Sequence, residues 1–316
     1  MEEPQPELDP FIRVRLRGLW AWVGLSGLVV LPLAVIAARL GWPVPRRDLI
    51  LVLYAWLYAA PLAWLVHTAR RHGIQIKRWL VPAATPRGWL EAAMIVPPQL
   101  LFSASSFMLL LTLVALVFPE GAQRLLERPE MTRIAPPDTP QPVVALMIVV
   151  VAPVAEELLF RGLLLHTLAS RWGFRRAAFA TAGIFAVLHA NLIGIFVFGL
   201  VLTVLYTTTR SLLAPMLCHA LNNLIPFLLM SMHTSGAARE EDVLSAVGLR
   251  SHAALVALVA GLSGLFMFTF VKQRWPAPGS ALPYDDAGAS PSIRGGAADD
   301  SESTSSRDHS PSPPPA

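Results

Sequence analysis

Runs of about 18 to 25 apolar residues with almost no charge inside recur along this sequence and restrict its fold more than any other feature. A helix needs about 20 such residues to cross the ~30 Å hydrocarbon core of a bilayer. Because lipid offers backbone amides no partner, a spanning segment must be helical or part of a closed barrel, and continuous apolar runs favour helices. Only 15% of the residues are charged, against about a quarter in soluble domains. The sequence therefore predicts an all-α, polytopic membrane protein.

The apolar runs predict about eight transmembrane helices, one of them short. They cover roughly residues 19–38, 49–66, 92–118, 143–168, 177–190, 192–209, 211–231 and 252–271. With a cytoplasmic N-terminus, the inner segments carry fourteen Lys and Arg residues and the outer segments eight. This positive-inside bias favours an N-in, C-in topology.

Three regions follow from these spans. Residues 1–18 form a cytoplasmic N-terminal segment, and 19–274 form the transmembrane domain, whose first helix we interpret as a retained signal anchor. Residues 275–316 are rich in Pro, Ser, Ala, Gly and Asp, and they predict a disordered cytoplasmic tail.

The net charge of +4 comes from arginines that flank the spans, so we expect a lipid bilayer and no nucleic acid as partner. The single cysteine, Cys218, excludes an internal disulfide. The strong preference for arginine over lysine, with abundant Ala and Pro, is typical of a GC-rich bacterial genome. We therefore expect the protein in a bacterial inner (cell) membrane.

Two adjacent glutamates, Glu156 and Glu157, lie deep inside an apolar run. A charged residue at mid-membrane costs ~2.5–3.5 kcal/mol on insertion scales, so such residues need partners or a function. Glu157 and Arg161 are four residues apart and can pair on one helical face. Glu156 points about 100° away around the helix, which leaves it for another task. The alternative interpretation is a buried ion pair that only fixes helix packing.

Candidate partners of Glu156 lie on later spans. His189 ends the fifth span, and the seventh contains His219 and Asn223, which are four apart and share a face. Either histidine alone would more often be a packed core residue. Counted from the proposed cytoplasmic ends, Glu156, His189 and Asn223 lie roughly 18 Å deep and His219 about 12 Å. This common depth predicts one site.

These residue types allow two chemistries. A carboxylate in a low-dielectric site can act as a general base towards water, with His189 holding the water, while His219 and Asn223 donate to a developing oxyanion. Alternatively, Glu156, His189 and His219 could ligate Zn²⁺ and leave a fourth position for water. Both remain open, since Glu and His suit either.

Three motifs, in this order on successive predicted helices, resemble those of the CPBP intramembrane proteases, the CAAX-protease and bacteriocin-processing family, also called the Abi family. They are Glu156-Glu157…Arg161, Phe185…His189 and His219…Asn223. The likeness covers about residues 140–235, which would form the catalytic core.

The resemblance implies an eight-helix fold that cleaves membrane-anchored peptide or protein substrates. It implies that Glu156 activates water together with His189, and that His219 and Asn223 form the oxyanion hole. Glu157 and Arg161 would support the site. A prenylated substrate does not follow from the resemblance.

Two other classes of protein fit the same residues. Intramembrane Glu, Arg and His also mark the ion pathways of transporters, but here they cluster without repeated halves. A membrane scaffold or immunity-type protein could keep the fold without catalysis. The Gly-x-Ser-Gly elements at Ser26 and Ser263 match rhomboid-like serine proteases, but small residues in membrane helices usually serve packing.

Overall fold

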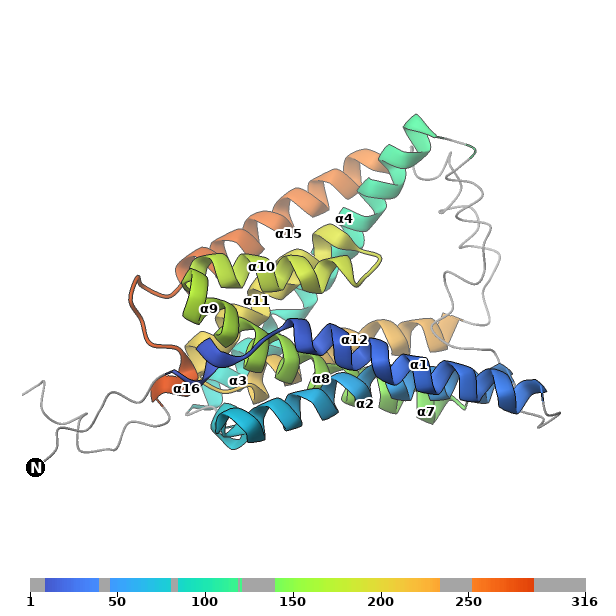
Figure 1. Cartoon of the computed structure of the whole chain (residues 1–316). Helices are drawn as coiled ribbons and strands as arrows, with labels where there is room; N and C mark the ends of the chain where they lie inside the picture. The colour runs from blue at the N-terminus through green and yellow to red at the C-terminus, as the bar shows by residue number, and fades with distance from the viewer. Residues whose placement is uncertain are drawn as a thin grey trace, which may run out of the picture.

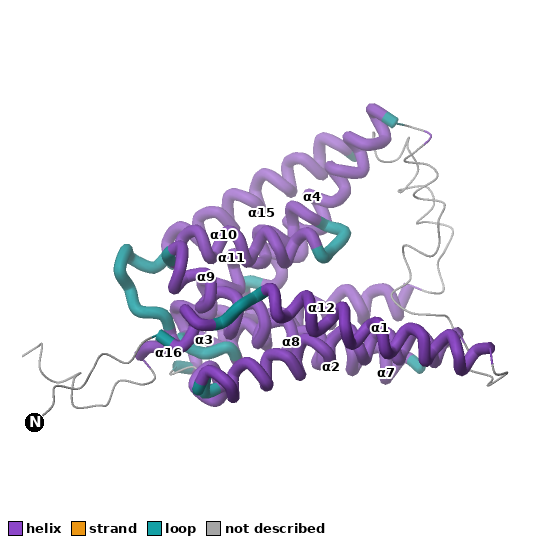
Figure 2. Tube along the Cα trace, in the orientation of Figure 1, coloured by secondary structure: helices purple, strands orange, loops and turns teal. Residues whose placement is uncertain are grey.

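The computed structural model describes residues 9–39, 46–80, 85–118, 120, 140–233 and 252–286. Within these ranges every regular element is a helix (Figure 2), which confirms the all-α class. The separate helices are α1 (Arg17–Arg39), α2 (Arg46–His72), α3 (Pro86–Met94), α4 (Val96–Val117), α10 (Phe174–Val187), α11 (Leu192–Thr209), α12 (Leu213–His233) and α15 (Ala253–Gln273). Short helices are η1 (Pro10–Arg13), η2 (Ile76–Leu80) and α16 (Pro283–Asp286).

One continuous helix, Gln141–Trp172, carries the paired glutamates, and we call it the acidic helix. It consists of α7 (Gln141–Ala145), η3 (Leu146–Val151), α8 (Ala152–Glu157), η4 (Leu158–Leu164) and α9 (Leu165–Trp172). The segments η3 and η4 are π-helical. Such widened turns are rare and often occur at functional sites. Here they flank α8, whose last two residues are Glu156 and Glu157.

Six helical stretches in the described residues are long and apolar enough to cross a membrane, which confirms a polytopic protein. They are Leu51–His72, Pro86–Val117, Gln141–Trp172, Leu192–Thr209, Leu213–Ser231 and Ala253–Gln273. These six correspond to six of the eight predicted spans, and the count of eight stays a prediction. α10 has only 14 residues, because it starts after Gly173 (φ 77°) and ends where the chain turns into α11. α1 contributes a shorter apolar helix, Arg17–Val30.

The helices form two groups around the acidic helix (Figure 1). α4 and α15 pack side by side on one flank, and α1 and α2 pack together on the other. α10 and α11 lie against each other, while α12 packs on α8. A Cβ on Gly199 of α11 would lie 3.0 Å from Ala182 of α10. The glycine therefore permits the close approach of these two helices.

The acidic helix is joined to α11 by two polar contacts. Arg161 donates from Nη2 to the Gly199 carbonyl oxygen at 3.1 Å, and the His166 Nε2 lies 2.9 Å from the Tyr206 hydroxyl. All of these groups are buried. Because both contacts link the same two helices, they fix the register between them.

Residues that precede the first long helix and residues that follow the last one meet at one end of the bundle. The ring of Tyr284, which is 5% exposed, lies 4.9 Å from that of Phe11. The Tyr284 hydroxyl accepts from the Gln75 N–H at 3.0 Å, and Arg210 donates to the Leu282 carbonyl at 3.1 Å. The segments before α1 and after α15 thus share one end, as an N-in, C-in topology requires. The cytoplasmic assignment of that end stays a prediction.

The same contacts involve the first residues of the predicted tail. Residues 275–286 pack on the bundle through Tyr284, although their composition predicted a disordered segment. A single buried aromatic ring supplies apolar contact that the average composition does not reveal. The rest of the predicted tail, 287–316, lies outside the described residues, as do residues 1–8.

Candidate active site

The centre of the site is a buried ion pair within the acidic helix. Glu157 is fully buried, and its Oε1 accepts from the Arg161 Nη1 at 2.9 Å. The i,i+4 spacing predicted this pair, and the structure confirms it. A buried charge needs such a partner, because an unpaired one would lose its hydration without compensation.

Arg161 is held on three sides. Besides Glu157, it donates to the Gly199 carbonyl, and its guanidinium lies over the Phe185 ring at 4.6 Å. A cation over an aromatic face is attracted by the ring quadrupole. Phe185, the first residue of the Phe-x-x-x-His motif, therefore anchors the arginine.

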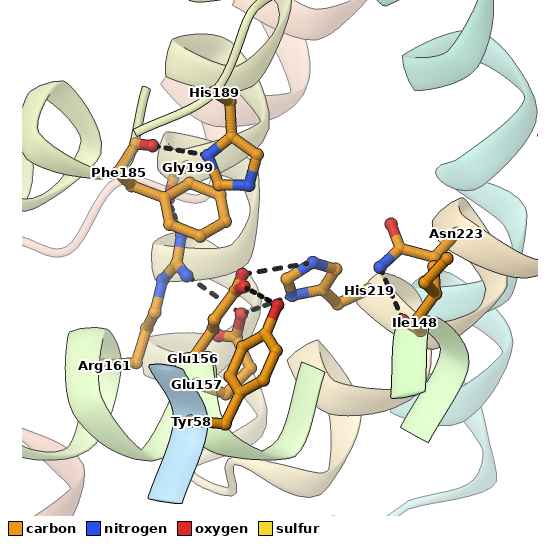
Figure 3. Close-up of polar contacts among 10 residues, drawn as sticks. All are labelled: Tyr58, Ile148, Glu156, Glu157, Arg161, Phe185, His189, Gly199, His219 and Asn223. Atoms are coloured by element: carbon orange, nitrogen blue, oxygen red, sulfur yellow. Dashed lines mark hydrogen bonds and ion pairs between the residues drawn. The ribbon is translucent and has the colours of Figure 1, made fainter. Parts of the chain in front are cut away.

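His219 of α12 spans the two glutamates (Figure 3). Its Nδ1 lies 2.9 Å from the Glu157 Oε1, and its Nε2 lies 3.7 Å from the Glu156 Oε2. Because an ionised carboxylate only accepts, Nδ1 carries the proton of the first contact. The second distance is too long for a hydrogen bond. His219 thus binds Glu157 and faces Glu156.

Glu156 differs from its neighbour in having few partners. Its side chain is 16% exposed, whereas that of Glu157 is 0% exposed. The Tyr58 hydroxyl of α2 donates to the Glu156 Oε1 at 3.5 Å (Figure 3). Among the described residues, the buried Oε2 has no hydrogen-bond partner. The Glu157 Oε2 is likewise without a partner, so the two carboxylates differ in exposure and in their donors: Glu157 accepts from Arg161 and His219, and Glu156 accepts, in the described part of the chain, only from Tyr58.

His189 and Asn223 lie at the border of this cluster and bind backbone groups. His189, just beyond the end of α10, has its Nδ1 2.7 Å from the Phe185 carbonyl. Asn223 donates from Nδ2 to the Ile148 carbonyl of η3 at 3.0 Å. The structure thus brings Glu156, Glu157, Arg161 and His219 together, whereas His189 and Asn223 bond to backbone carbonyls and not to either carboxylate. The Phe185 ring borders both histidines, 4.7 Å from His189 and 5.8 Å from His219.

The residues predicted as possible zinc ligands do not form a metal site in the positions that they occupy. No group of three or more His, Cys, Asp and Glu side chains in the described part of the chain is arranged to hold a metal ion. The His219 Nδ1 is bound to Glu157, and the His189 Nδ1 to a backbone carbonyl. A zinc site with Glu156, His189 and His219 would require these side chains to rearrange.

Two contributors to the site were absent from the sequence prediction: Tyr58, which reaches Glu156 from a helix about 100 residues earlier, and the carbonyl of Gly199. A tyrosine in an apolar run gives no signal of its partner. A backbone carbonyl gives none at all.

Fold and site together define a class: a polytopic helical membrane protein with two carboxylates, an imidazole and a guanidinium gathered inside the bundle. Residues 138–225 match the family model described as Rce1-like, type II CAAX prenyl endopeptidase Rce1-like. This is the CAAX-protease family that the three motifs indicated, so the predicted family is confirmed for this segment. Neither the curated proteins nor the solved structures gave a match. The family points to a protease of the membrane interior.

Proposed function

We propose that this protein is an intramembrane endopeptidase in which Glu156 activates the attacking water. The observation that carries the proposal is the position of the Glu156 carboxylate. One of its oxygens is buried without a hydrogen bond and faces an imidazole nitrogen 3.7 Å away. A water molecule beside these two atoms could contact both the carboxylate oxygen, as an acceptor, and the imidazole nitrogen.

The reaction would proceed by general base catalysis. Glu156 takes a proton from water as the water oxygen bonds to the scissile carbonyl carbon, and the carbonyl oxygen becomes an oxyanion. The tetrahedral intermediate then collapses, the C–N bond breaks, and Glu156 returns the proton to the leaving amine. Water is consumed, and the products are a new carboxylate and a new amine.

His219 and Asn223 supply donors to the oxyanion in this proposal. The His219 Nδ1–H is committed to Glu157, so the donor would be Nε2–H, which requires the imidazolium form. With that proton, Glu156, Glu157, Arg161 and His219 sum to zero charge, which favours burial of the cluster. The Asn223 amide nitrogen has two hydrogens, and only one is used by the Ile148 carbonyl.

His189 would hold the water or the substrate. Its Nδ1–H donates to the Phe185 carbonyl, so in the neutral tautomer Nε2 is an acceptor. That nitrogen can accept from the water that Glu156 deprotonates. His189 is half-buried and sits at the turn between α10 and α11.

The substrate class we propose is a peptide or protein anchored in the membrane. The matching family is described by its action on CAAX prenyl sequences. A lipid-anchored or transmembrane segment would place its scissile bond at the depth of the glutamates, whereas a freely soluble peptide would first have to enter an apolar bundle.

The test uses the full chain reconstituted in proteoliposomes. Two internally quenched probes are offered, one ending in a prenylated CAAX sequence and one built on a single transmembrane segment. We expect cleavage of at least one probe, abolished by Glu156→Gln. Glu91→Gln is the control, because Glu91 is a carboxylate outside the site that pairs with Arg274. Turnover that persists in Glu156→Gln would reject the assignment, and two uncleaved probes would favour the scaffold or transporter reading.

A further inference from the structure

Tyr58 connects the N-terminal part of the chain to the Glu156 carboxylate. It lies on α2, which packs against α8 and η4 of the acidic helix. Its hydroxyl donates to the Glu156 Oε1 at 3.5 Å, and Figure 3 shows it pointing from α2 toward the two glutamates and His219. α2 lies outside residues 138–225, the segment that matches the family.

The contact is selective for one carboxylate of the pair. Glu157 already accepts from Arg161 and His219, through the same oxygen. In the part of the chain that the structure describes, the Tyr58 hydroxyl is the one hydrogen-bond donor to Glu156. Without it, both Glu156 oxygens would lack a bond that fixes the rotation of the carboxylate.

A general base works best when its reacting oxygen is held in place. A donor on Oε1 fixes the plane of the carboxylate and leaves Oε2 toward the His219 Nε2. A phenol suits this task inside a membrane, because its ring is apolar and only its hydroxyl needs a partner.

We propose that Tyr58 is a positioning residue of the active site, which orients Glu156 so that Oε2 receives the proton of the attacking water. This inference rests on the proposed function. It adds to the site a residue from the N-terminal helices, which the family match does not cover.

The first experiment tests the contact without any turnover. Melting temperatures of the purified full chain in detergent are compared for the wild type, Tyr58→Phe, Glu156→Ala and the double variant. We expect Tyr58→Phe to lower the melting temperature by about 2–4 °C when Glu156 is present. It should have no further effect in the Glu156→Ala background. Equal shifts in both backgrounds would show that the hydroxyl does not bind Glu156.

The second experiment tests the positioning role with the prenylated and transmembrane probes. We expect Tyr58→Phe to lower kcat about tenfold, the effect of losing one hydrogen bond to a charged group, and to change KM less than twofold. Tyr284→Phe is the matched control, because it removes another hydroxyl with one hydrogen bond, from the Gln75 N–H, at the end of the bundle. We expect it to leave kcat unchanged.

The outcomes separate this inference from the proposed function. If the wild type cleaves a probe, Glu156→Gln does not, and Tyr58→Phe matches Tyr284→Phe in kcat, the positioning role is overturned while the protease proposal stands. If the wild type cleaves neither probe, both are overturned. A fall in kcat for Tyr58→Phe, with coupling to Glu156 in the melting temperatures, supports the inference.

Discussion

The imidazole of His219 bonds to Glu157 through Nδ1 at 2.9 Å, and it faces Glu156 through Nε2 at 3.7 Å. One ring therefore divides the adjacent glutamates into two environments. Glu157 is an acceptor for two cationic or polar side chains and is fully buried. Glu156 has a single donor and a free oxygen. The two carboxylates should respond very differently to mutation.

Glu157→Gln should destabilise the fold far more than Glu156→Gln does. Loss of the Glu157 charge leaves Arg161 buried without a counter-ion, and breaking such a pair costs ~3–5 kcal/mol. Glu156→Gln removes no ion pair of hydrogen-bonding length and should cost about 1 kcal/mol. Thermal unfolding in detergent measures both. Equal melting temperatures for the two variants would contradict the division of roles.

Arg161→Lys should also destabilise the protein. A lysine cannot reproduce the fork that reaches both Glu157 and the Gly199 carbonyl, nor the flat contact with Phe185. We expect a loss of ~1–3 kcal/mol of unfolding free energy. Arg87→Lys is the matched control, since Arg87 forms an i,i+4 pair with Glu91 while being 86% exposed. That surface pair is worth at most ~1 kcal/mol, so a similar loss in both variants would refute the argument from burial.

Gly199→Ala should separate α10 from α11. The added Cβ would lie 3.0 Å from Ala182, and overpacking of this kind costs ~1–3 kcal/mol. Gly183→Ala on α10 is the control, because its Cβ would meet nothing within 4 Å. An alanine there should stabilise the helix slightly. If both variants have the same melting temperature, the helices are not in the close contact described.

Tyr284→Ala should weaken the attachment of residues 275–286. Deleting a buried aromatic ring costs ~3–5 kcal/mol, and this ring packs on Phe11 and His166. Tyr284→Phe keeps the ring and loses only the hydrogen bond from the Gln75 N–H, for about 1 kcal/mol. Limited proteolysis of the C-terminal segment, together with the melting temperature, reads out both. Identical cleavage rates in the wild type and Tyr284→Ala would show that the ring does not hold the segment.

The helical fold could be predicted because it depends on local hydropathy. Apolar runs specify spanning helices wherever they are long enough, and all but two of the predicted spans lie in such helices. α10 is shorter than a usual membrane span, since its apolar run continues toward His189 while the helix ends at Val187. Its length is set by the turn into α11 and by burial between helices, which hydropathy alone does not encode.

The site was predictable only where it is local. The Glu157–Arg161 pair follows from one helical turn, and the structure has it. The partner of His219 does not follow from one helical turn. The choice between Glu156 and Glu157 depends on how α12 packs on α8. For the same reason, neither the bond from Asn223 to the Ile148 carbonyl nor the contact of Tyr58 with Glu156 could be predicted. These contacts join segments far apart in the chain.

Two contacts join the acidic helix to α11 at different positions along their length: Arg161 to Gly199, and His166 to Tyr206. Sliding or rotating either helix would break both hydrogen bonds at once, so the two helices move as one rigid unit that carries the glutamates. If the bundle opens to admit a peptide, the opening must then occur between other pairs of helices. The carboxylates would stay in place during that opening.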